Sequence, residues 1–322
     1  MIDSLGRNID YMRISITDRC NLRCKYCSPD GFSMLTHDDI LRYEEILRVC
    51  RAAAKTGIKS IKVTGGEPLV RKGCINFLRN LKSLPGIEYV TITTNGVLLE
   101  RFIDDMADMK LDGVNISLDS LNPDTYKQIT NRNFFYAVWR SLNKAIDAGL
   151  RVKVNCVPMR GLNDADIIPI ARLAERLPID VRFIEFMPTS AGESFNRITG
   201  SEIYRRLLKV YPDLINTKRR GFGPARYFKS SKMSGSVGII DAIGKCFCTS
   251  CNRVRLTSDG FLKQCLFHED GLDIRGMLRN GSDDTEIEAA FKRTVYHKPE
   301  RHMFESRTST NMGIKNMAQI GG

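Results

Sequence analysis

Residues 11–27 of the chain read YMRISITDRCNLRCKYC, and they join a predicted β-strand to a loop with three cysteines. The strand, Met12–Thr17, is rich in β-branched and apolar residues and is followed closely by Cys20, Cys24 and Cys27. A four-iron cluster needs four ligands, so three thiolates leave one iron open to a substrate or cofactor. A structural zinc ion would instead need a fourth protein ligand, for which His37 is the nearby candidate.

Six predicted strands alternate with helical segments between Tyr11 and Met187, the pattern of repeated βα units around a parallel sheet. The strands are Met12–Thr17, Ser60–Thr64, Tyr89–Thr94, Gly113–Leu118, Arg151–Val157 and Val181–Phe186. Amphipathic helices are expected over Asp38–Thr56, Cys74–Leu84 and Asp164–Leu177. A doubly wound sheet and a barrel both fit this pattern. Polar motifs at the ends of successive strands favour the α/β class with a partial, six-unit βα TIM-like barrel.

The alternation of strands and helices ends after Met187. The later part has a loop over Pro188–Gly200, a helix near Ser201–Tyr211 and short strands at Arg226–Lys229, Ser236–Ile240, Arg253–Thr257 and Phe261–Gln264. We therefore expect a partial barrel over residues 1–190 and a C-terminal α+β element over residues 191–322 that covers the open side of the barrel.

The composition restricts the class of protein but does not identify its ligand. With 49 Lys and Arg against 37 Asp and Glu, the formal net charge is +12, which suits a nucleic acid, an anionic small molecule or an acidic surface equally well. The first residues lack the apolar core of an export signal, and no run of about 18 apolar residues occurs, so we expect a cytoplasmic protein without a membrane segment. In that reducing compartment, clustered cysteines favour metal binding over disulfides.

A second group of thiols lies near the C-terminal end, where Cys248-Thr-Ser-Cys251 is followed by Cys265. Zinc and a second iron–sulfur cluster are both compatible with this spacing. A zinc ion would take Cys246 or His268 as its fourth ligand.

The first cysteine loop resembles the cluster-binding motif of the radical S-adenosylmethionine superfamily, and companion motifs follow in the expected order. Tyr26 matches the aromatic residue that lies beside the adenine in that superfamily. Polar and glycine-rich motifs at the ends of the next three strands also match: Gly65-Gly66-Glu67-Pro68, Thr93-Thr94-Asn95-Gly96 and Ser117-Leu118-Asp119. The resemblance implies that Tyr26, Gly66, Thr93 and Ser117 bind S-adenosylmethionine.

The run CTSCNRVRLTSDG, residues 248–260, with Cys265 beyond it, closely resembles the C-terminal motif of the GTP 3′,8-cyclases, the MoaA family of molybdenum cofactor biosynthesis. The resemblance covers nearly the whole chain. It extends to Gly321-Gly322, which is similar to a family tail that reaches toward the active site. Ser28 and Lys62 depart from the commonest pattern, which has Met and Arg there, and neither change removes a ligand.

This resemblance implies two [4Fe–4S] clusters, one held by Cys20, Cys24 and Cys27 and the other by Cys248, Cys251 and Cys265. Six basic side chains match family positions that line the GTP site: Arg13, Lys62, Lys153, Arg182, Arg253 and Arg255. Arg253 and Arg255 are two residues apart on a predicted strand, so they share a face, and guanidinium groups suit phosphate oxygens. No protein side chain is expected to be catalytic, because the radical comes from S-adenosylmethionine.

The implied reaction converts GTP to (8S)-3′,8-cyclo-7,8-dihydroguanosine 5′-triphosphate, the first step of molybdenum cofactor biosynthesis, by a carbon–carbon lyase. A 5′-deoxyadenosyl radical would take hydrogen from the ribose 3′ carbon, and the substrate radical would add to carbon 8 of guanine. The implied partners are an electron donor and a downstream cyclic pyranopterin monophosphate synthase, with no nucleic acid or membrane. A monomer and a homodimer are both compatible with the sequence.

Two other functions compete with this hypothesis. A peptide-modifying radical enzyme with an auxiliary cluster would carry more C-terminal cysteines and would not need the arginine pair beside them. A zinc-stabilised nucleic-acid-binding protein would account for the positive charge and for Cys248-Thr-Ser-Cys251. That class leaves the motifs at the strand ends unexplained.

Overall fold

The computed structural model describes residues 1–27, 34–187, 195–218, 221–243, 247–302 and 317–321. Ser28, Cys246, Gly322 and the first part of the predicted loop Pro188–Gly200 lie outside the described residues. The chain forms two compact units. The first unit consists of Met1–Asn21, Asp30–Thr93 and Cys248–Gly322, and the second of Leu22–Pro29 and Thr94–Phe247.

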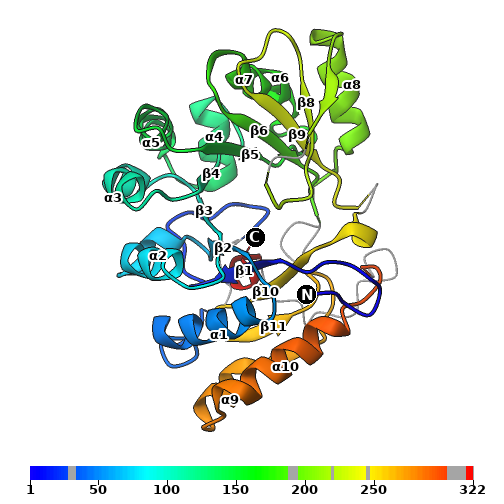
Figure 1. Cartoon of the computed structure of the whole chain (residues 1–322). Coiled ribbons are helices and arrows are strands. Elements are labelled where there is room, and N and C mark those ends of the chain that lie inside the picture. The colour runs from blue at the N-terminus through cyan, green and yellow to red at the C-terminus, as the bar shows by residue number, and fades with distance from the viewer. Residues whose placement is uncertain (28–33, 188–194, 219–220, 244–246, 303–316, 322) are drawn as a thin grey trace. The chain divides into compact units, whose positions relative to one another are not determined.

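The sheet of the first unit brings together strands from both ends of the chain (Figure 1). Its order is β12-β11-β10-β1-β2-β3, with the bounds Gly271–Asp273, Phe261–Lys263, Arg253–Leu256, Tyr11–Ser15, Ser60–Thr64 and Tyr89–Thr94. The strands β10, β1, β2 and β3 are parallel, and β11 and β12 are antiparallel additions at the edge. All five residues of β2 are buried, as expected for a parallel strand that is covered on both faces.

The helices of the first unit also come from distant parts of the sequence. They are α1 (Tyr43–Lys55), α2 (Cys74–Lys82), α9 (Ile274–Arg279), α10 (Asp284–Tyr296) and α11 (Met317–Ile320), with the 3₁₀ turns η1 (Pro68–Val70) and η4 (Cys248–Ser250). Helices α1 and α10 lie side by side (Figure 1).

The sequence predicts that α1 begins at Asp38, but it begins at Tyr43. The helix begins there because its N-terminus is capped. The Glu45 carboxylate accepts a hydrogen bond from the N–H of Arg42 at 2.6 Å, which fixes the first helical turn at Tyr43.

The sheet of the second unit has the order β4-β5-β6-β9-β8-β7. The bounds of these strands are Gly113–Ser117, Val152–Cys156, Asp180–Ile184, Ser236–Ile240, Arg226–Lys229 and Ile215–Thr217. The helices of this unit are η2 (Leu99–Phe102), α3 (Ile103–Asp108), α4 (Pro123–Thr130), α5 (Phe135–Asp147) and α8 (Gly200–Val210). The first four strands of the order are parallel, and β8 and β7 are antiparallel additions.

The predicted helix Asp164–Leu177 is broken into three short pieces. They are η3 (Asp164–Asp166), α6 (Ile167–Ala171) and α7 (Leu173–Arg176). Pro169 has no N–H to donate to the carbonyl of Ala165, so a regular α-helix cannot run from η3 into α6.

The strands that follow Met187 join both sheets. In the first unit β10 pairs with β1, and in the second unit β9 pairs with β6, in both cases parallel. The boundary at residue 190 stays a prediction. None of the described helices is long and apolar enough to cross a membrane.

Candidate active site

Four basic side chains stand in one row across the sheet of the first unit. In the strand register Arg13 of β1 lies between Arg255 of β10 and Lys62 of β2, and Lys263 of β11 is the neighbour of Arg255. Residues in register on neighbouring strands point to the same face, so the four cations share one side of the sheet. Three of the six residues predicted to bind GTP are therefore brought together here: Arg13, Lys62 and Arg255.

Arg255 is the most deeply placed guanidinium in this row, with 7% of the residue exposed. Burial, together with repulsion from Arg13 and Arg253, lowers the pKa of Arg255 well below its usual range. Among the residues that the structure describes, no carboxylate forms an ion pair with Arg255, and its Nη1 donates to the carbonyl of Gly321 at 2.7 Å. Buried positive charges that repel one another favour the binding of an anion.

The last described turn of the chain lies at the C-terminal ends of β1 and β2. Helix α11 contacts β1, and Gly321 adopts a left-handed φ of +81°. A Cβ at this position would lie 2.3 Å from Thr64 Oγ1 and 3.2 Å from Ser15 Cβ, so only glycine fits there without a shift. Gly321 therefore lies beside Arg255 in the first unit, and a role of the tail in the active site stays a prediction.

The second group of cysteines lies next to this row. Cys248 and Cys251 occupy η4 and its end, where the N–H of Cys251 donates to the carbonyl of Cys248 at 3.2 Å, and Cys265 follows β11. Burial would raise the pKa of the Cys251 thiol, but the charges of Arg253 and Lys298 and hydrogen bonds from Arg253 lower it to about 7. A lowered pKa favours the thiolate, which is the form of cysteine that binds a metal.

The cysteine side chains keep the chemistry of potential metal ligands. In the part of the chain that the structure describes, no cysteine forms a disulfide. Within the same ranges, no three His, Cys, Asp or Glu side chains are grouped as ligands of one metal ion. A cubane cluster binds each thiolate through a different iron, so its ligands need not converge on one point.

The turn that follows β2 packs against the beginning of the first cysteine loop. The N–H of Gly66 donates to the carbonyl of Thr17 at 2.6 Å, and the N–H of Glu67 donates to that of Arg19 at 2.8 Å. A Cβ on Gly66 would lie 2.5 Å from the Arg19 carbonyl oxygen, so this close approach requires glycine. The turn Gly65-Gly66-Glu67 is therefore fixed directly beside Cys20.

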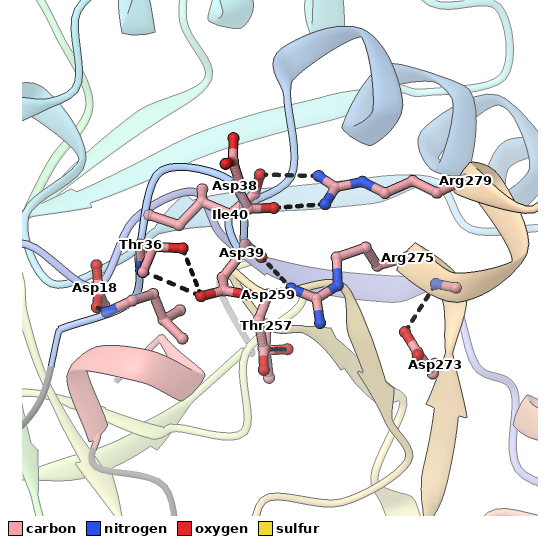
Figure 2. A network of polar contacts seen from close by, with 12 residues as sticks. Asp18, Thr36, Asp38, Asp39, Ile40, Thr257, Asp259, Asp273, Arg275 and Arg279 are labelled. Carbon is pink, nitrogen blue, oxygen red and sulfur yellow. Dashed lines mark hydrogen bonds and ion pairs between the residues drawn. The ribbon is translucent and has the colours of Figure 1, made fainter.

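Helix α9 anchors the segment that follows the first cysteine loop (Figure 2). Arg275 donates to the carbonyl of Asp39 at 2.7 Å, and Arg279 donates to the carbonyl of Asp38 at 2.5 Å. Asp18 accepts a hydrogen bond from the N–H of Leu35 at 2.7 Å, so both ends of the loop that carries Cys20, Cys24 and Cys27 are tied to the first unit.

In the second unit, Tyr26 is held by a buried carboxylate. Its hydroxyl donates to Asp119 at 2.7 Å, and the N–H of Val157 donates to the same carboxylate at 2.8 Å. Burial raises the pKa of Asp119 to about 6, while the two hydrogen bonds oppose that rise. Asp119 follows the predicted cofactor residue Ser117 by two positions, so β4 and the residues directly after it provide both a predicted contact and the support of Tyr26.

Lys153 and Arg182 lie on neighbouring strands of the second unit, and both are surrounded by polar groups. Arg182 donates to Asn155 at 2.9 Å and to Asn115 at 2.5 Å. Lys153 forms an ion pair with Asp180 at 3.3 Å.

Gly238 and Tyr227 complete these surroundings. Lys153 donates to the Tyr227 hydroxyl at 3.0 Å. A Cβ at Gly238 would lie 3.1 Å from Arg182 Cγ, so the glycine leaves room for that side chain.

Sequence analysis missed several of these supporting residues. Asn115, Asn155 and Asp180 are each two positions from a predicted site residue on a strand, so alternation along the strand could have shown that they share its face. No sequence signal pointed to Lys263, because its partner Arg255 lies across a strand pair.

The pair of Lys153 and Asp180 gives a prediction on stability. Replacing Asp180 with alanine should lower the free energy of unfolding by about 3 kcal/mol, because it removes a carboxylate beside a mostly buried ammonium. Glu100→Ala in the same unit is the matched control, since its partner Arg140 is exposed and the loss should stay below about 1 kcal/mol. Urea denaturation measures both, and equal losses would contradict the prediction.

Two family models match the chain one after the other. The Radical SAM superfamily matches residues 14–174, and Molybdenum Cofactor Synthesis C matches residues 179–304. The solved structure of Streptococcus suis SuiB bound to S-adenosylmethionine aligns with a TM-score of 0.67 over 91% of this chain and 66% of that chain. At 14% identity this likeness bears on the fold alone, and it agrees with the predicted partial TIM-like barrel. The chain is a radical SAM protein.

Curated relatives define the family more narrowly. The GTP 3′,8-cyclase of Moorella thermoacetica is 44% identical over 331 residues, and that of Clostridium perfringens strain SM101 is 40% identical over 324 residues. Each alignment covers 100% of both chains. This chain belongs to the GTP 3′,8-cyclase family, which confirms the family resemblance of the sequence motifs.

Proposed function

We propose that this protein is a radical SAM cyclase that converts GTP to (8S)-3′,8-cyclo-7,8-dihydroguanosine 5′-triphosphate, the first step of molybdenum cofactor biosynthesis. The observation that carries the proposal is the full-length relation to GTP 3′,8-cyclases. The row of cations beside the second group of cysteines supports it independently, because such a row suits a triphosphate.

Cys20, Cys24 and Cys27 would hold one [4Fe–4S] cluster, and Cys248, Cys251 and Cys265 would hold the other. When bound, the first cluster and S-adenosylmethionine supply the 5′-deoxyadenosyl radical that takes hydrogen from the ribose 3′ carbon of GTP. The protein's part is to position the cofactor. Tyr26, oriented by Asp119, would support the adenine, and Gly66, Thr93 and Ser117 would contact the rest of S-adenosylmethionine.

The arginines of the first unit would bind the triphosphate. Arg13 and Arg255 are neighbours in register, and Arg253 is two positions from Arg255 on β10. One guanidinium group can bind phosphate oxygens through two parallel hydrogen bonds. An anion here would offset the burial and the repulsion that lower the pKa of Arg255. Lys62 extends the same row, and Lys153 and Arg182 are the remaining residues that we propose for GTP binding.

The proposed function is tested by the products of an anaerobic reaction. Reconstituted protein is incubated with dithionite, S-adenosylmethionine and either GTP, ATP, CTP or guanosine, and the products are identified by mass spectrometry. We expect 5′-deoxyadenosine together with cyclised nucleotide from GTP. If GTP yields no cyclised nucleotide while 5′-deoxyadenosine forms, the cyclase assignment is wrong and the radical SAM class is retained.

The second ligand set makes a separate prediction. Cys265→Ala should lower the iron content of the reconstituted protein by about half, because one of two four-iron clusters loses a thiolate, while cleavage of S-adenosylmethionine continues. Cys156→Ala removes a buried thiol of β5 outside both motifs and should keep the full iron content. Iron and acid-labile sulfide are measured for each variant. Unchanged iron in Cys265→Ala would remove Cys265 from the ligand set.

The reaction also requires partners. A one-electron donor must reduce the first cluster, and the cyclised nucleotide must pass to a cyclic pyranopterin monophosphate synthase. A monomer and a homodimer are both compatible with the sequence. Neither nucleic acid nor a membrane is part of the proposed function.

A further inference from the structure

Lys298 is a buried lysine next to the second group of cysteines, and the proposed function gives it no role. It follows helix α10, and only 3% of the residue is exposed. Its Nζ donates a hydrogen bond to the carbonyl of Gln264, the residue directly before Cys265. The Gln264 side chain in turn donates to the carbonyl of Thr294 in α10. The position of Cys265 is therefore coupled to the end of α10 through the lysine.

Arg7 ties the same lysine to the other cysteine segment. Its Nη2 donates to the carbonyl of Lys298 at 2.9 Å, and its Nη1 donates to the carbonyl of Cys248 at 3.0 Å. Asp3 holds the guanidinium through an ion pair of 2.7 Å, and both side chains are almost fully buried. Cys248 and Cys265 belong to segments that are separate in the sequence, and Arg7 with Lys298 connects them.

The negative charges that act on the Lys298 ammonium come from the thiols of Cys251 and Cys265. Among the described residues no carboxylate forms an ion pair with it. Burial lowers the pKa of Lys298, and the thiolates of Cys251 and Cys265 act in the opposite direction, whereas Arg7 and Arg253 add to the lowering. A buried ammonium costs free energy unless anions compensate it. Thiolates that carry the negative charge of a metal cluster would provide that compensation.

We infer that Lys298 is a positioning residue of the second cluster, whose fixed positive charge stabilises the cluster's thiolate ligands and its reduced state. This inference rests on the proposed function, because it takes Cys248, Cys251 and Cys265 as the ligands. The reduction potential of an iron–sulfur cluster depends on the charge and the hydrogen bonds around its sulfurs. A cation in this place makes the gain of an electron more favourable and raises the potential.

The test is a redox titration of the second cluster, followed by electron paramagnetic resonance. The full-length chain carries Cys24→Ala in every sample, so that the first cluster does not contribute to the signal. Lys298→Met removes the charge and keeps the length of the side chain, whereas Lys298→Arg keeps the charge. Lys292→Met is the matched control, because Lys292 is an exposed lysine of α10. Iron content and circular dichroism are recorded for all variants.

The expected result is a lower midpoint potential in Lys298→Met, with Lys298→Arg and Lys292→Met close to the parent protein. Loss of the second cluster's iron in Lys298→Met, with retention in Lys298→Arg, would support the same role for the charge. An unchanged potential in Lys298→Met overturns the inference. Equal loss of iron in Lys298→Met and Lys298→Arg also overturns it, because the charge would then not be what matters.

If Cys248, Cys251 and Cys265 are not the cluster ligands, the experiments give a different result. In that case Cys265→Ala keeps its iron, whatever the result for Lys298. If Cys265→Ala loses half of the iron and Lys298→Met behaves like Lys292→Met, the ligand assignment stands and the role of Lys298 is wrong.

Discussion

Cys24→Ala is expected to abolish the cleavage of S-adenosylmethionine and to remove about half of the iron from the reconstituted protein. The first loop offers three thiolates, and the loss of one leaves the cluster with two protein ligands and no defined open iron. The loop itself should keep its anchors, since Asp18 and the arginines of α9 hold its flanking residues through backbone groups. The effect should therefore be chemical and not a loss of fold.

Cys50→Ala provides the matched control for the first prediction. Cys50 is a fully buried thiol of α1 that lies outside both cysteine motifs, and burial raises the pKa of its thiol far above its usual range. This variant should keep all of its iron and its activity. Production of 5′-deoxyadenosine is measured by chromatography. Normal production by Cys24→Ala would remove the first loop from the radical chemistry.

Arg253→Ala should weaken the binding of GTP by roughly ten- to a hundredfold, because a charge-assisted contact to phosphate contributes about 1.5–3 kcal/mol. The loss should be smaller for guanosine, which has no phosphates. Cleavage of S-adenosylmethionine should continue with little cyclised product. Calorimetric titration of the reconstituted protein with GTP and guanosine measures both losses.

The structure adds a control to this prediction. Arg253 also donates hydrogen bonds to Cys251, so its replacement can disturb the second cluster as well as the phosphates. Arg13→Ala removes a neighbouring guanidinium from a different strand and should likewise lose more affinity for GTP than for guanosine while keeping its iron. If both variants lose GTP and guanosine binding equally, the arginines do not bind the triphosphate.

Several strands could be predicted because the pattern that identifies a strand lies within the strand's own residues. β2, β3, β8 and β9 begin and end at the predicted residues, since β-branched and apolar runs bounded by turns define a buried strand. The single helix predicted over Asp164–Leu177 follows from its apolar periodicity, which takes no account of the N–H that Pro169 lacks. Helices α9 and α10 were not predicted, and their burial depends on contacts with α1, more than 200 residues earlier in the chain.

The candidate site could be predicted only where motifs are continuous in the sequence. The cysteines and the strand-end motifs are of this kind. The row from Lys263 to Lys62 depends on the register between β10 and β1, which no single segment encodes. Lys298 and Arg7 are single basic residues among 49, and only their hydrogen bonds distinguish them from solvated surface charges.

The pairing of β1 with β10 also determines when each unit can form during synthesis on the ribosome. Asn252, directly before β10, donates to Asp10, directly before β1 and 242 residues earlier, so the pairing of β1 with β10 must wait until β10 has been made. At about 5–20 residues per second this delay is roughly 10–50 s. The strands of the second unit lie almost entirely within Thr94–Phe247 and can assemble while the rest of the chain is still being translated. The proposed ligands of the second cluster are thus expected to come together last, after the second unit has been able to fold.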